Sequence, residues 1–125
     1  MSRNWTFAID WLGRPTLENH ERRNHYMTSH RERQKWKNAS IQAVRLKGIP
    51  KLDLVELTFQ ARFTEGPLPD PGAIAPSVKG IIDGIKEAGV ITDDSGKYVH
   101  AITYLAPRLD PTRSDAIIIN ILECT

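Results

Sequence analysis

The strict alternation of apolar and polar side chains between residues 55 and 63 constrains the fold of this chain more than any other feature. Five apolar residues occupy every second position of this segment: Val55, Leu57, Phe59, Ala61 and Phe63. Because successive side chains of a β-strand point to opposite faces, this period predicts a strand over Leu52–Phe63 with one buried face.

A shorter alternation near the N-terminus predicts another strand, over Trp5–Trp11. The following residues, Leu12–Thr28, have no periodicity and contain Gly13, Pro15 and many charged side chains. We therefore expect a long basic loop between the first strand and the next element.

Two segments have helical signals. Ser29 with Glu32 three residues later makes a capping box, which predicts a helix beginning at Ser29, and Gly48 and Pro50 predict its end. The inward stripe of this helix is expected to contain Trp36, Ala39, Ala43, Val44 and Leu46.

The second helical segment begins near Pro76, which suits a first helical turn, and ends at Gly89. Its apolar residues recur at helical spacing: Val78, Ile81, Ile82, Ile85 and Ala88. Two further strands are expected, over Tyr98–Tyr104 and Asp115–Leu122. The order β-α-β-α-β-β predicts one α/β (α+β) domain over residues 1–125, with a mixed sheet packed by two helices.

Charge divides the chain into a basic and an acidic part. Residues 1–50 contain ten Lys or Arg against four acids, and residues 51–125 contain seven against eleven. A metal-dependent nuclease needs bases for phosphates and carboxylates for metal, although two solvated faces of opposite sign explain the same pattern. A single cysteine, Cys124, and the lack of a long apolar run indicate a reducing cytoplasmic setting without a membrane span.

Candidate chemistry concentrates between Asp70 and Asp94. Asp70 precedes the second helix, Lys79 and Asp83 are four residues apart on it, and Asp93 and Asp94 follow it. If the acids converge in space, their oxygens suit Mg²⁺, which can activate water beside a scissile phosphate. Lys79 could stabilise the charge that develops on the phosphate oxygens.

Simpler interpretations remain open for each of these residues. The segment Asp93–Gly96 is also a good turn sequence, and Asp70 also suits the start of a helix. Lys79 and Asp83 also fit a surface ion pair. His20, His25 and His30 do not have the spacing of a helical zinc pair.

The ordered motifs of this region resemble the RusA family of crossover junction endodeoxyribonucleases, the Holliday junction resolvases. That family carries Asp-x-Asp-Asn-Leu, a helix with Lys and an Asp-Gly-Leu-like segment, then Gly and a closing Asp-Asp. The matching residues are Asp70, the helix start Ala75-Pro76-x-Val78-Lys79, the segment Ile82-Asp83-Gly84-Ile85, Gly89, and Asp93-Asp94.

The resemblance implies a Mg²⁺-dependent endonuclease of DNA recombination and repair. It implies Asp70, Lys79 and Asp94 as catalytic residues, with Asp70, Asp94 and the neighbouring Asp93 as metal ligands. It also implies a symmetric homodimer on branched or four-way DNA, in the cytoplasm of a bacterial or phage-infected cell. Phosphate contacts are then expected from a basic set: Arg22, Arg23, His25, Arg31, Arg33, Lys35 and Lys37.

The first acidic motif departs from the family pattern. Gly72 stands where the second Asp is expected, Ala73 stands for Asn, and Ile74 stands for Leu. Loss of one carboxylate should weaken Mg²⁺ binding. Three hypotheses follow: a nuclease with an impaired metal site, a non-catalytic relative that binds DNA junctions or a protein partner, and an interaction domain unrelated to nucleic acid.

Overall fold

The structure is a computed structural model that describes residues 2–11 and 26–125, with side chains from residue 30 onward in the second range. Within these ranges a four-stranded sheet is combined with two α-helices and a short 3₁₀-helix. The elements follow in the order β1 (Asn4–Asp10), α2 (Tyr26–Lys47), β2 (Val55–Phe63), η1 (Pro71–Ile74), α3 (Ala75–Glu87), β3 (Val99–Leu109) and β4 (Ala116–Glu123). The predicted order of strands and helices is confirmed.

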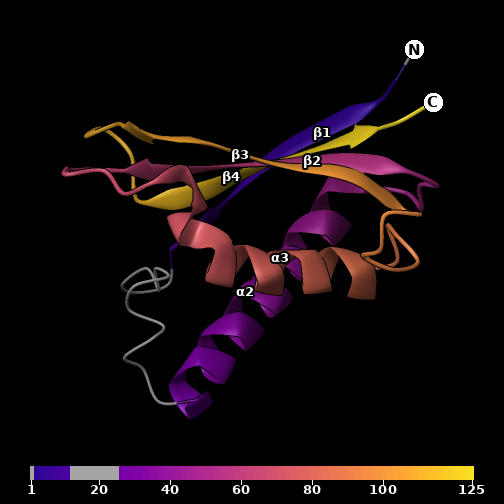
Figure 1. The fold of residues 1–125 in the computed structure, drawn as a ribbon, viewed down its shortest axis with the longest axis horizontal. Helices are drawn as coiled ribbons and strands as arrows, with labels where there is room; N and C mark the ends of the chain where they lie inside the picture. The colour runs from indigo at the N-terminus through magenta and orange to yellow at the C-terminus, as the bar shows by residue number, and fades with distance from the viewer. Residues whose placement is uncertain (1, 12–25) are drawn as a thin grey trace.

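The sheet is mixed, as predicted. Its strand order is β1-β4-β2-β3, in which β4 pairs antiparallel with both β1 and β2, while β2 and β3 are parallel. Parallel neighbours need a crossover connection, which η1 and α3 provide. Both helices cover the same face of the sheet and leave the other face without helices (Figure 1).

The core lies between the helices and the covered face of the sheet. Phe7, Ile119 and Phe59 are paired across three adjacent strands and are buried, so the alternation that predicted β2 also describes its packing. At one end of this core, Trp11 packs against Trp36 and Phe63, and its ring centroid lies 5.3 Å from the ring centroid of each. Full burial of each large apolar side chain contributes roughly 1.5–3 kcal/mol.

Both helices end as the sequence predicted, through a glycine in the left-handed region. Gly48 has φ 64° and Gly89 has φ 88°. After each glycine, the backbone N–H of the next residue reaches back over the last turn, from Ile49 to the carbonyl of Val44 and from Val90 to that of Ile85, both at 3.3 Å. This is the Schellman motif.

Two predictions about α2 are wrong. The helix begins at Tyr26, so Ser29 and Glu32 lie inside it and do not cap its N-terminus. The side chain of Leu46 is 89% exposed and does not belong to the inward stripe. The buried row is Trp36, Ser40 and Val44, spaced by four residues, and Leu46 is turned about 200° away from Val44 at 100° per residue.

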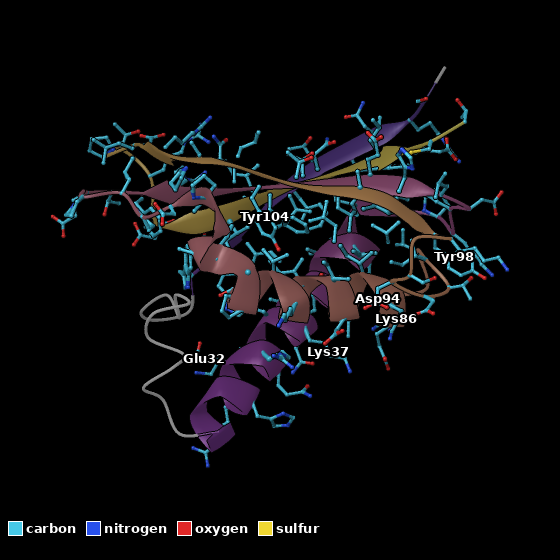
Figure 2. The ribbon with its side chains drawn as sticks, in the orientation of Figure 1. Glu32, Lys37, Lys86, Asp94, Tyr98 and Tyr104 are labelled. Atoms are coloured by element: carbon cyan, nitrogen blue, oxygen red, sulfur yellow. The ribbon has the colours of Figure 1, made fainter. Side chains whose placement is uncertain are left out.

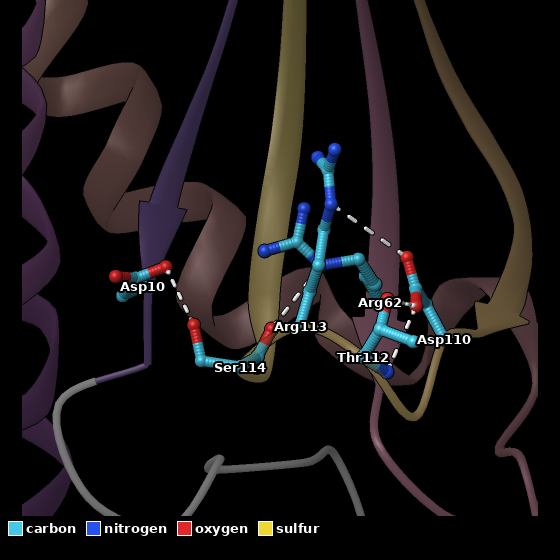
Figure 3. A network of polar contacts seen from close by, with 6 residues as sticks. All are labelled: Asp10, Arg62, Asp110, Thr112, Arg113 and Ser114. Carbon is cyan, nitrogen blue, oxygen red and sulfur yellow. Dashed lines mark hydrogen bonds and ion pairs between the residues drawn. The ribbon is translucent and has the colours of Figure 1, made fainter.

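The turn between β3 and β4 is tied to two other strands by polar contacts (Figure 3). The Ser114 hydroxyl donates to the Asp10 carboxylate at 3.1 Å, and Arg62 Nε donates to the Ser114 carbonyl at 3.1 Å. Asp110 in the same turn pairs with Arg113 at 3.8 Å. β3 extends five residues beyond the predicted strand end and delivers the chain to this turn.

Within residues 2–11 and 26–125, no helix is both long enough and apolar enough to cross a lipid bilayer.

Candidate functional site

Helix α3 carries the predicted catalytic residue Lys79 and, four residues later, Asp83. Its apolar side chains Val78, Ile81 and Ile85 are completely buried. Lys79 is exposed and Asp83 is partly exposed. Because residues four positions apart lie on the same side of a helix, these two side chains share one face of α3.

Two glycines, each one residue after Lys79 or Asp83, hold α2 against the adjacent side of α3. A Cβ atom at Gly80 would lie 2.6 Å from the backbone oxygen of Arg33, and one at Gly84 would lie 2.5 Å from the backbone oxygen of Lys37. Any side chain at either position would therefore push the helices apart. The close contact fixes the middle of α2, including Arg33, beside the Lys79 and Asp83 face of α3.

Asp94 reaches the same region from the turn that follows α3. After Gly89 the chain reverses, and Val90 and Ile91 are buried, which anchors the turn to the core. In Figure 2, Asp94 lies near the C-terminal end of α3. The side chain of Asp94 is exposed.

These elements enclose an open pocket of about 250 Å³ lined by Arg33, Lys79, Ile82, Asp83 and Asp94. Two predicted catalytic residues, Lys79 and Asp94, and one predicted phosphate contact, Arg33, therefore share one pocket. Among the described residues, no ion pair within 4.0 Å joins the two cations to the two carboxylates. Two cations and two carboxylates that line one pocket suit a phosphate group together with its metal ion.

Asp70 does not line this pocket. It is exposed and lies just before η1, where its backbone oxygen accepts the Ala73 N–H at 3.1 Å. Asp70 and Asp94 are attached to opposite ends of a 13-residue helix, which spans roughly 20 Å. Their convergence on one metal ion stays a prediction.

Asp93, the weaker metal candidate, makes a local contact. Its carboxylate accepts the backbone N–H of Asp94 at 2.7 Å. This hydrogen bond, helped by the nearby positive charge of Lys86, holds the pKa of Asp93 below its ordinary value. Asp93 is therefore ionised at neutral pH, with one oxygen already occupied by the turn.

The carboxylates of the pocket fit a Mg²⁺ site that is completed by water and substrate phosphate oxygens. Within the described parts of the chain, no three His, Cys, Asp or Glu side chains are grouped closely enough to hold a metal ion. Mg²⁺ is nevertheless often held by one or two carboxylates together with water and substrate phosphate oxygens. Asp83 and Asp94, which line the same pocket, supply that smaller set.

The predicted phosphate contacts on α2 lie on two sides of the helix. Arg33 and Lys37 are on the side that faces α3, and Lys37 pairs there with Glu87 at 3.7 Å. Arg31 and Lys35 are exposed and lie about 200° away, with Lys35 paired to Glu32 at 3.5 Å. The other three predicted contacts lie outside the described residues: Arg22, Arg23 and His25.

The sequence did not single out Asp83 as a site residue, although its spacing from Lys79 was evident. A second signal was available in the glycines at positions 80 and 84, each one residue after a charged side chain. Small residues four apart on a helix allow a second helix to approach closely, so they indicated which face of α3 meets a neighbour.

A scan of the chain against protein-family models found no match, and a search of curated proteins found none either.

Proposed function

We propose that this chain is a RusA-like Holliday junction resolvase, a Mg²⁺-dependent endonuclease that nicks branched or four-way DNA in recombination and repair. The observation that carries the proposal is the pocket shared by Lys79, Asp94 and Arg33. These residues belong to three separate segments of the chain. The resemblance implies catalysis for the first two and phosphate contact for the third.

In this proposal Arg33 and Lys79 bind the phosphate to be cut. Their charges neutralise the phosphate oxygens, and Lys79 stabilises the additional negative charge of the transition state. Asp94 and Asp83 hold Mg²⁺, and Asp70 contributes only if its segment moves toward the pocket. The bound ion supplies charge neutralisation and a more acidic water molecule.

The remaining cations of α2 extend the DNA contact. Arg31 and Lys35 on the exposed side of α2, and Arg22, Arg23 and His25 before it, are proposed to hold phosphates further along the duplex without reading bases. The protein is proposed to act as a homodimer, which would place two such pockets on opposed strands. The compartment proposed is the bacterial or phage-infected cytoplasm.

Cleavage of a synthetic four-way junction tests the nuclease directly. With Mg²⁺ present, the protein should introduce paired nicks in opposed strands, and Lys79→Ala and Asp94→Asn should each remove the products. Arg45→Gln, an exposed cation in the last turn of α2, is the matched control and should cut normally. No cleavage by the unaltered chain at high concentration, with Mg²⁺ or Mn²⁺, would contradict the nuclease proposal.

A second function, junction binding without cleavage, is favoured by Gly72. At this position the expected carboxylate is missing, and a Cβ atom built on Gly72 would meet nothing within 4 Å. The backbone there therefore leaves room for the Cβ atom of an aspartate. If the chain binds junctions in a gel-shift assay but does not cut, cleavage by Gly72→Asp combined with Ala73→Asn would show that these two changes disabled the site, and no cleavage would place the defect elsewhere.

The salt dependence of DNA binding distinguishes the third hypothesis, an interaction domain unrelated to nucleic acid, from the other two. Phosphate contacts release counterions, so junction affinity should fall steeply as salt rises. A chain that binds no DNA even at low salt would favour the interaction domain.

A further inference from the structure

Strand β3 forms one edge of the sheet (Figure 1). It has 11 residues and, within the described parts of the chain, β2 is its only strand neighbour. The backbone groups along its outer side therefore face away from the sheet. An uncovered edge of this kind is a template for pairing with a strand of another chain.

Apolar side chains are exposed on both faces of this edge strand. Ile102 is 43% exposed and Leu109 is 54% exposed on the helix-covered side, where they are in register with the core residues Leu57 and Phe63. Leu105, 43% exposed, lies on the helix-free side. A partner that covered one face would leave the other exposed, whereas an added strand places neighbours beside both.

The register of β3 selects where such a strand can pair. Strand β3 has one more residue than β2 between Val99 and Ala101, and one more between Leu105 and Arg108. Its pairing with β2 is therefore uninterrupted over Ala101–Leu105. Pro107 has no N–H to donate beyond that point. The centre of the regular segment is Thr103.

A two-fold axis through Thr103 makes the regular segment complementary to itself. Antiparallel pairing about this axis sets Ile102 opposite the partner's Tyr104 on the helix-covered side, and Ala101 opposite the partner's Leu105 on the other side. Both pairs are apolar and keep to one face, as cross-strand neighbours must.

The charges beyond the two ends of β3 favour a second copy of this chain as the occupant. Asp93 and Asp94 outweigh Lys97 before the strand, while Arg108 and Arg113 outweigh Asp110 at its end and in the turn after it. Antiparallel pairing carries the basic end of each strand toward the acidic end of its partner, which favours this orientation.

We propose that two copies of this chain associate through β3, paired antiparallel about a two-fold axis at Thr103, to form a continuous eight-stranded sheet. This inference rests on the proposed function, which includes a homodimer, and it names the surface through which the two copies associate. It requires no catalytic activity, so association measurements test it separately from the cleavage assay. Because five residues per strand make a small contact, the dimer should be weak and depend on concentration.

Sedimentation velocity from about 5 µM to about 500 µM covers the range expected for a small interface. The unaltered chain should shift from monomer to dimer across this range, and Leu105→Glu should stay monomeric throughout. Leu68→Glu is the matched control, because Leu68 is 40% exposed but lies in the loop before η1. A monomer at every concentration, or equal effects of the two substitutions, would overturn the proposal and leave the edge to a different partner.

A disulfide tests the register. Antiparallel partners have Cα atoms about 4.5–5.5 Å apart, within the usual range for a disulfide. In a Cys124→Ser background, Thr103→Cys should give a covalent dimer on mild oxidation, while Thr112→Cys in the exposed β3–β4 turn should stay monomeric. Equal crosslinking of both variants, or a dimer that Thr103→Cys does not crosslink, would refute pairing at Thr103.

Discussion

Substitution of Gly84 by alanine tests the helix contact on which the pocket depends. The new Cβ atom would lie 2.5 Å from the backbone oxygen of Lys37 and 2.6 Å from the Cβ of Ser40, where ordinary contacts begin at 3.4 Å. The first neighbour is main chain inside α2 and cannot rotate away. The two helices must therefore separate, or the new side chain is not accommodated.

The expected loss of stability follows from three contributions. Alanine is a better helix former than glycine by about 1 kcal/mol, which favours the variant. Overpacking typically costs about 1–3 kcal/mol and occasionally more. Separation of the helices also strains the buried hydrogen bond from the Ser40 hydroxyl to the Ile81 carbonyl, 2.9 Å long, and such a bond contributes about 1 kcal/mol. We expect a net loss of about 2 kcal/mol.

Urea unfolding followed by circular dichroism measures this difference. A loss of about 2 kcal/mol should also lower the melting temperature by roughly 6–10 °C in a domain of this size. Gly72→Ala is the control, because Gly72 lies in η1 with nothing within 4 Å of a new Cβ atom, and it should change stability by less than about 0.5 kcal/mol. A Gly84→Ala variant as stable as the parent, or more stable, would refute the close contact of α2 with α3.

Three further predictions use other contacts. Ser40→Ala should destabilise the fold by about 1 kcal/mol in urea unfolding, because it removes the buried hydrogen bond to Ile81; an unchanged midpoint would contradict a role for that bond. Arg33→Gln should lower the slope of log affinity for junction DNA against log salt by about 0.9, the value for one lost phosphate contact, and Arg45→Gln should leave it unchanged. The Arg3 guanidinium hydrogen-bonds both oxygens of Glu123, at 3.0 and 2.9 Å, and holds the pKa of Glu123 below its ordinary value. Because that pKa is lowered by folding, the stability advantage over Glu123→Gln should be present at neutral pH and disappear as pH falls below about 4.3 through the lowered pKa; an advantage that grew on acidification would refute the assignment.

Where local pattern and tertiary packing agree, the sequence predicted the structure well. The alternation in β2 and the glycines that end both helices lead to the observed elements because one short-range rule decides each of them. Leu46 shows where such rules stop. The spacing of Leu46 fits an apolar stripe, but the side of α2 that is buried carries Trp36, Ser40 and Val44. Because the central residue of these three is a polar serine, a pattern of apolar residues alone does not indicate this side.

In the candidate site, too, local spacing predicts some positions and tertiary contacts decide the others. Lys79 and Asp83 are neighbours by helical spacing alone, so their proximity was predictable. Arg33 joins them because glycines at 80 and 84 admit the α2 backbone, a contact that depends on missing side chains and is therefore easily overlooked. Asp94 could be placed only by the path of the turn after α3.

The order of the strands has a consequence for the first acidic motif. Since β2 and β3 are parallel, the chain leaves β2 at one end of the sheet and enters β3 at the other, with α3 returning between them. Asp70 belongs to the departing segment and Asp94 to the arriving one. A carboxylate on α3 itself, such as Asp83, can join Asp94 without any movement of the segment around Asp70. If the pocket holds Mg²⁺, Asp83→Asn should therefore weaken binding of the ion more than Asp70→Asn does.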